Sequence, residues 1–196
     1  KSAKIAAYYY ISPQVWASRP GSIETLKGLI ARMFVIFPFE EALYRDAGVP
    51  CLFVGHPLLD LLPPAKEKEL PKDPLQIGLL PGSRASEVTR HLPLFLEAFG
   101  LLRTRYPQAK ALIFAAENLP DSAYAPAIGR AGVEIVRENG YARRSDLDLA
   151  LSSSGTATLE NALLGIPMVV IYKLSWLTHA IAKAIVKVPY IAMVNI

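Results

Sequence analysis

The amino-acid sequence predicts an α/β protein built from doubly wound parallel sheets, and three observations support this class. Short apolar runs alternate with helical stretches along nearly the whole chain. Helices that cross between successive strands require those strands to be parallel. A segment with four prolines and mixed charges, LLPPAKEKELPKDP, interrupts the alternation once. We therefore expect two domains, namely part of a first domain in residues 1–61, a linker in 62–74, and a second domain in 75–196 that is incomplete at its carboxyl end.

The first 61 residues predict three strands with helices between them. Three strands are too few to bury both faces of a parallel sheet, so this portion is expected to belong to a larger domain. The predicted strands are IAAYYYI (5–11), MFVIF (33–37) and CLFVG (51–55), and the predicted helices cover 23–31 and 40–47.

After the linker the alternation of strands and helices restarts. The predicted strands are 75–80, 110–116, 133–138, 146–152 and 168–172, with a last extended piece at 189–195. The predicted helices are 85–105, 124–130, 157–164 and 176–186. A sheet of this kind binds its ligands beyond the carboxyl ends of its strands.

Composition excludes several classes of protein. Hydrophobic residues make up 52% and charged residues 19%, which is typical of a globular chain. One cysteine fits a reducing compartment, with cytoplasm as the default. The net charge of +4 is scattered and forms no basic block, so we expect no nucleic-acid partner. The apolar stretch 172–196 carries three lysines, too many for a membrane span. Because the chain starts without methionine and ends without a tail, we expect a section of a longer protein.

The loop LLPGSR, residues 79–84, is the first candidate binding site. Gly82 lets the backbone approach a ligand, Ser83 offers a hydroxyl, and Arg84 offers a forked cation that suits a pyrophosphate. The alternative is an ordinary turn from strand to helix with an arginine in solvent.

The loop SSSGT, residues 152–156, is the second candidate. Ser154, Gly155 and Thr156 precede a predicted helix, whose first N–H groups attract anions, although the same residues are also typical of a helix cap. Glu160 is not in the position of a capping-box partner. It is expected either to accept hydrogen bonds from sugar hydroxyls or to complement the helix dipole.

Other polar residues give weaker signals. Asp146 and Asp148 stand at the amino end of a strand, the wrong edge for the site, and are interpreted with the neighbouring arginines as a solvated turn, so no metal site is expected. His56 is interpreted as a turn histidine and Cys51 as a core residue. Dinucleotide, P-loop and serine-hydrolase motifs are absent. The amphipathic stretch 174–188 fits packing on the sheet, with membrane contact as the alternative.

Four ordered stretches together resemble the lipid-A-disaccharide synthase family. They are ISPQVWASRPG (11–21), FPFEEALYRDAGVPCLFVGHPLLD (37–60), LLPGSRASEV (79–88) and SSSGTATLENALLGIPMVVIYKLSWLTHAIAKAIVKVPYIAMVN (152–195). The resemblance implies two Rossmann-like domains facing a cleft, the GT-B architecture, with residues 75–196 as the half that binds the nucleotide sugar. It implies transfer of 2,3-diacylglucosamine from UDP to 2,3-diacylglucosamine 1-phosphate, with inversion at the anomeric carbon and without metal or cofactor. It also implies a cytoplasmic protein attached peripherally to the inner membrane.

The resemblance also implies roles for individual residues. Gly82, Ser83 and Arg84 would lie at the donor pyrophosphate, with further donors from the second loop. Those donors are Ser154, Gly155 and Thr156, while Glu160 would hold the ribose and Asn195 matches an asparagine near the family's site. The acidic general base lies in the part of the family that this chain lacks, so no catalytic residue is assigned.

Two other functions stay open from the sequence. In the first, the chain by itself would be a nucleotide-binding module without turnover. In the second, the site would belong to a related UDP-N-acetylglucosamine epimerase or transferase. The stretches ISPQVWASRPG and FVGHPLLD favour the synthase over the latter.

Overall fold

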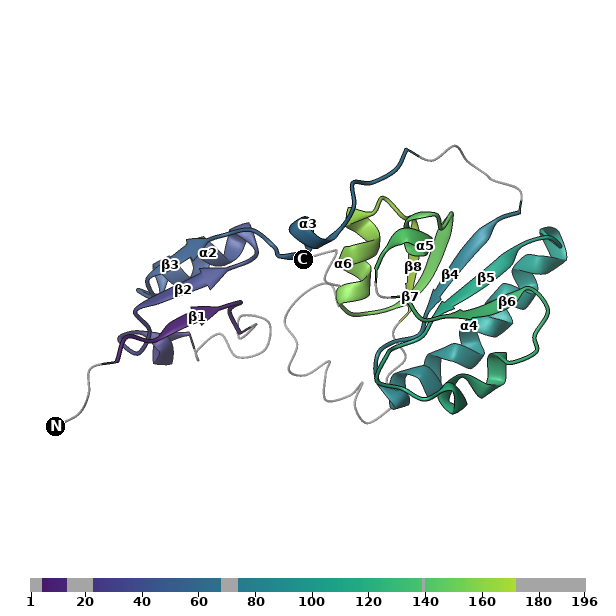
Figure 1. Cartoon of the computed structure of the whole chain (residues 1–196). Helices are drawn as coiled ribbons and strands as arrows, with labels where there is room; N and C mark the ends of the chain where they lie inside the picture. The colour runs from purple at the N-terminus through teal and green to yellow at the C-terminus, as the bar shows by residue number, and fades with distance from the viewer. Residues whose placement is uncertain (1–4, 14–22, 68–73, 139, 172–196) are drawn as a thin grey trace. The chain divides into compact units, whose positions relative to one another are not determined.

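The computed structural model describes residues 5–13, 23–67, 74–138 and 140–171, and these form two compact units that divide between Leu61 and Leu62 (Figure 1). Each unit has its own parallel sheet and its own core, and each is described here by itself. The helix predicted at 176–186, the strand at 189–195 and most of the stretch 11–21 lie outside the described residues.

The first unit contains a three-stranded parallel sheet in the order β1-β2-β3. Its elements are β1 (Tyr8–Tyr10), η2 (Glu24–Leu26), β2 (Arg32–Val35), α2 (Pro38–Asp46), β3 (Cys51–Phe53) and α3 (Leu58–Leu61). Its core is built around Met33, Val35 and Tyr44, none of which is exposed.

Helix α2 begins where the sequence supplies starting signals. Pro38 takes the first helical position, where its missing N–H costs nothing. The buried carboxylate of Glu40 accepts hydrogen bonds from the N–H groups of Phe37 and Ile36, at 3.1 and 3.3 Å. It also accepts one from the Ser12 hydroxyl at 2.5 Å, which ties the loop after β1 to this helix.

The helix predicted at 23–31 is wrong beyond its first turn. Only Glu24–Leu26 is helical, as a single 3-10 turn, and Lys27 is already extended. Gly28 then takes a positive φ of 77°, which redirects the chain toward β2. The apolar pattern here reflects residues such as Ile23 and Ile30 that turn toward the core from irregular backbone.

The second unit contains a five-stranded parallel sheet in the order β6-β5-β4-β7-β8. Its strands are β4 (Gln76–Leu80), β5 (Lys110–Phe114), β6 (Val133–Val136), β7 (Leu149–Ser153) and β8 (Met168–Ile171). Its helices are α4 (Ala85–Arg105), η3 (Asp121–Ala127), α5 (Ala142–Ser145) and α6 (Thr156–Leu163).

This strand order is the Rossmann-like arrangement. The chain winds outward from β4 through β5 to β6, then returns to the other side of β4 and winds outward through β7 to β8. The predicted class, α/β with parallel doubly wound sheets, is confirmed. The winding reverses between β4 and β7, which is where open sheets bind their ligands.

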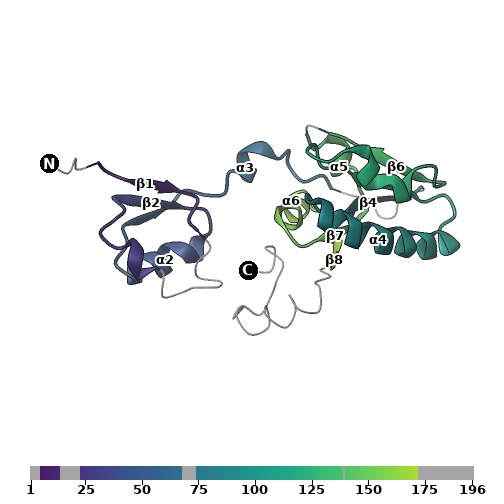
Figure 2. The same ribbon diagram turned by 90° about the horizontal axis from the view of Figure 1, so that it is seen from below.

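Helices cover the two faces of this sheet (Figure 1, Figure 2). An apolar layer lies beneath them on each face. On one face α4 and η3 bury residues such as Phe95 and Tyr124 against Leu79. On the other face Leu147, Leu164 and neighbouring apolar side chains pack against the sheet beside α6. None of the described helices has the length and hydropathy needed to cross a membrane.

Candidate functional site

The two loops singled out in the sequence leave the sheet side by side. Strands β4 and β7 are hydrogen-bonded neighbours, and Leu80 at the end of β4 is in register with Ser152 near the end of β7. Both strands run in the same direction, so residues 81–84 and 154–155 emerge at one edge of the sheet. That edge is the switch point, so the sheet itself brings the predicted site residues of both loops together.

The first loop is held close to the N-terminus of α4. Gly82 has a φ of 123°, a conformation that glycine adopts without steric cost. Ser83 and Arg84 are exposed, and Arg84 is the N-cap of the helix. The buried ring of His91 lies 2.9 Å through Nδ1 from the carbonyl oxygen of Pro81, which fixes the start of the loop from inside α4.

Glu87 is a residue of this loop region that the sequence reasoning missed. Its Oε2 accepts the N–H groups of Ser83 and Arg84 at 3.1 and 3.3 Å, and its Oε1 accepts Nη1 of Arg84 at 2.9 Å. The signal was a glutamate three residues after the N-cap. It was not recognised because a capping box is expected where serine or threonine is the N-cap residue, whereas arginine is the N-cap residue here.

A third loop, after β5, borders the first one. The amide nitrogen of Asn118 lies 3.5 Å from the carbonyl oxygen of Ser83. Arg137 fixes this loop by donating to the carbonyl oxygens of Ala116 and Leu119 at 2.8 and 2.7 Å. Asn118 carried no signal in the sequence, because nothing in its local pattern places it beside residue 83.

The second loop places a helix N-terminus at the same edge. Helix α6 begins on Gly155, which is extended and has no side chain that could cap the helix. Ser153 is buried, while Ser154 and Gly155 are partly exposed and Thr156 is exposed. Thr158 donates its hydroxyl to the carbonyl oxygen of Gly155 at 2.8 Å. The arrangement suits an anion at the start of α6, because the N-cap residue has no side-chain oxygen to accept the first N–H groups of the helix.

Glu160 has a partner that neither sequence interpretation included. Its Oε2 lies 2.5 Å from Nη1 of Arg144, and the side chains of Arg144 and Glu160 are only 9% and 16% exposed. Arg144 also donates from Nε to Oδ1 of Asn161 and from Nη2 to the carbonyl oxygen of Ala157, both at 2.9 Å. One arginine on α5 therefore binds the first turns of α6 at three points.

The interpretation of residues 143–148 as a solvated turn is wrong for two of them. Arg144 is buried, and so is Asp148, whose Oδ2 accepts the N–H of Gln76 at 2.8 Å. Asp146 is half-exposed and pairs with Lys66 at 2.6 Å. Within the described part of the chain no group of three or more His, Cys, Asp or Glu residues could hold a metal ion.

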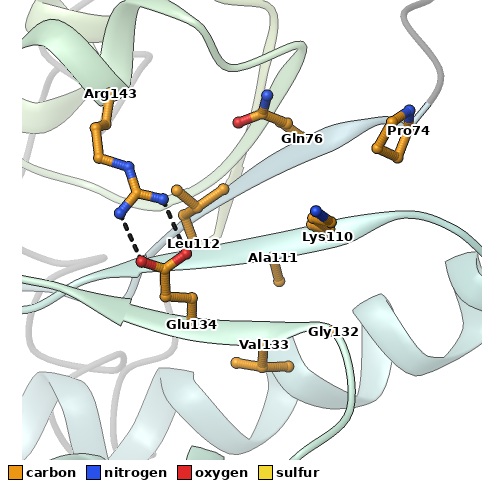
Figure 3. A pocket seen from close by; sticks show the side chains of 9 residues that line it. All are labelled: Pro74, Gln76, Lys110, Ala111, Leu112, Gly132, Val133, Glu134 and Arg143. Atoms are coloured by element: carbon orange, nitrogen blue, oxygen red, sulfur yellow. Dashed lines mark hydrogen bonds and ion pairs between the residues drawn. The ribbon is translucent and has the colours of Figure 1, made fainter.

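A hollow in the second unit lies at the opposite edge of the sheet. It has a volume of about 470 Å³ and is lined by Gln76, Lys110, Gly132 and other residues at the amino ends of β4, β5 and β6 (Figure 3). Arg143 binds Glu134 there through two bonds of 2.6 and 2.8 Å, which lowers the pKa of that carboxyl group. The hollow is open to solvent, and it faces away from the switch point.

His56 and Cys51 have structural surroundings in the first unit. The Nδ1 of His56 accepts the N–H of Leu58 at 3.1 Å, the ring contacts Phe37, and burial lowers the pKa of His56. Cys51 is half-buried and donates to the carbonyl oxygen of Glu41 at 3.2 Å, and burial raises its pKa. Asn195, the remaining predicted site residue, lies outside the described residues.

Comparison with known proteins covers the whole chain. The family model described as lipid-A-disaccharide synthetase matches residues 1–196. A lipid-A-disaccharide synthase of Syntrophus aciditrophicus is 44% identical over 209 residues, covering 100% of this chain and 55% of that protein. One from Geobacter metallireducens is 42% identical, covering 100% of this chain and 53% of the relative. Among solved structures, the GtfA/B complex matches 88% of this chain and 35% of its own, with 9% identity and a TM-score of 0.49.

These relatives are nearly twice as long as the region they share with this chain. The chain spans about half the length of the curated relatives it matches. It matches the family model from its first residue to its last, and the ordered stretches that carry the resemblance include both loops of the switch point. The chain therefore belongs to the lipid-A-disaccharide synthetase family.

Proposed function

We propose that this chain is the donor-binding part of a lipid-A-disaccharide synthase. The reaction transfers 2,3-diacylglucosamine from UDP to 2,3-diacylglucosamine 1-phosphate, and the products are UDP and the β-1,6-linked disaccharide 1-phosphate. Family membership supports the reaction, and the placing of two small-residue loops at one switch point supports the donor site. The second observation carries the proposal, because it joins residues 82–84 and 154–156 into one surface.

The charges at this edge suit a nucleotide diphosphate. The hydroxyl of the acceptor sugar attacks the anomeric carbon, the bond from that carbon to the pyrophosphate oxygen breaks, and the hydroxyl proton passes to a base. Negative charge then grows on the departing UDP, and Arg84 together with the N-termini of α4 and α6 meets it. We propose that these groups serve without a metal ion.

Glu160 remains a candidate for the ribose hydroxyls. Its bond to Arg144 uses Oε2 and holds the carboxylate toward the first turns of α6. A carboxylate has more lone pairs than this one bond uses, so it can still accept hydrogen bonds from a diol. The acceptor-side contacts and the base are assigned to the longer protein, and attachment to the cytoplasmic face of the inner membrane follows from acylated substrates.

Titration calorimetry of the intact protein with UDP tests the donor site. Arg84→Ala should weaken UDP binding about tenfold or more, because one charge-assisted contact is lost. Arg105→Ala is the matched control, since it removes an exposed arginine from the far end of the same helix. Equal UDP affinity in the two variants would remove the first loop from the phosphate site.

A binding module without turnover is the second candidate, since the chain spans only half of its relatives. Recombinant residues 1–196 that bind UDP but form no disaccharide would support it. Disaccharide formation by this chain alone would exclude it.

A further inference from the structure

The donors of the first loop are already engaged by a carboxylate of the chain itself. The N–H of Ser83, the N–H of Arg84 and the guanidinium of Arg84 all donate to Glu87, over 2.9 to 3.3 Å. These are the same groups that the proposed function assigns to the pyrophosphate. A carboxylate and a phosphate both present negatively charged oxygens to N–H donors, so one can occupy the place of the other.

The shape of the loop accommodates this carboxylate. A Cβ atom on Gly82 would lie 2.5 Å from Oε2 of Glu87 and 2.7 Å from its Cβ, distances too short for any side chain. The room that glycine leaves at position 82 is therefore filled by Glu87. The Glu87 side chain is only 19% exposed, whereas the side chain of Arg84 is 78% exposed.

We propose that Glu87 is an internal competitor of the pyrophosphate. Its carboxylate takes the place of the phosphate on the donors of Ser83 and Arg84, and it withdraws when UDP binds. The inference rests on the proposed function, because it concerns the same subsite. A phosphate oxygen placed on the donors of Ser83 and Arg84 would meet the Glu87 carboxylate at close range, where two like charges repel. Displacing Glu87 offsets part of the binding free energy of UDP, and its return favours release of UDP as product.

The test compares three variants of the intact protein by calorimetry with UDP and with uridine, which has no phosphate. Glu87→Gln keeps the shape and the oxygen acceptor but removes the charge, so UDP should bind about fivefold more tightly with uridine binding unchanged. Glu87→Ala removes the competitor altogether and should tighten UDP binding at least as much. Glu97→Gln removes an exposed charge further along α4 and should leave both ligands unaffected.

The outcomes separate this inference from the function on which it rests. Weaker UDP binding in both Glu87 variants, with uridine unchanged, would mean that Glu87 positions Arg84 and would overturn the competitor role while leaving the donor site in place. Wild-type protein that binds UDP no more tightly than uridine, with no effect of Arg84→Ala, would overturn both. Melting curves of the Glu87 variants within a few degrees of wild type would show that lost binding is not lost folding.

Discussion

Replacing Arg144 by methionine should destabilise the second unit strongly, because this side chain is the main polar link between α5 and α6. The substitution removes the bonds to Glu160, Asn161 and the carbonyl oxygen of Ala157. It leaves the Glu160 carboxylate, which is 16% exposed, without its counter-charge. Breaking a buried pair by removing one partner costs about 3–5 kcal/mol. The lower end, about 3 kcal/mol, is expected here, because Glu160 retains some access to water.

Arg143 provides a matched control one residue away. It also forms an ion pair, with Glu134, but the two side chains are 46% and 57% exposed. Exposed pairs contribute at most about 1 kcal/mol, so Arg143→Met should cost less than that. Urea titration, together with native-state hydrogen exchange at the amides of β7, would measure the free energy of unfolding of this unit. Similar losses in the two variants would refute the distinction between the buried and the exposed arginine.

Two predictions concern the first unit. Burial lowers the pKa of His56 in the folded protein below its unfolded value of 6.5, so the unfolded chain binds the proton more tightly. The free energy of unfolding should therefore fall as the pH drops through 6.5, and it should level off below the pKa of the folded protein. His56→Gln should reduce that fall in denaturation midpoints measured at several pH values, and an unchanged pH profile would count against it. Burial raises the pKa of Cys51, so iodoacetamide should alkylate it more slowly in the folded protein than in urea at the same pH. Equal rates would contradict the raised pKa.

Regular elements could be predicted where burial follows a simple period. Helix α4 runs over Ala85–Arg105 as expected, because its apolar face repeats over nearly six turns. Strands β4 and β8 are also within one residue of the prediction. The prediction of a helix at 23–31 was wrong because the positive φ of Gly28 is incompatible with a continuous helix despite the apolar pattern. Helix α5 was missed because its four residues, ARRS, are too short and too polar to show a period.

The site could be predicted only as far as strand direction determines it. Arg84 and Gly155 follow the carboxyl ends of β4 and β7, so they could be predicted as site residues without any knowledge of side-chain positions. The pairing of Arg144 with Glu160 spans two elements and 16 residues, so no local pattern reveals it. Glu87 lies within three residues of Arg84, yet its role depends on the rotamer it takes over Gly82.

The central claim is that UDP binds where β4 and β7 end, and a crystal structure of the intact protein with UDP tests it most directly. The pyrophosphate should lie between residues 82–84 and the start of α6 at Gly155, with the Glu87 carboxylate withdrawn from the N–H groups of Ser83 and Arg84. UDP bound instead in the hollow beside Lys110 and Arg143, at the opposite edge of the sheet, would contradict the account.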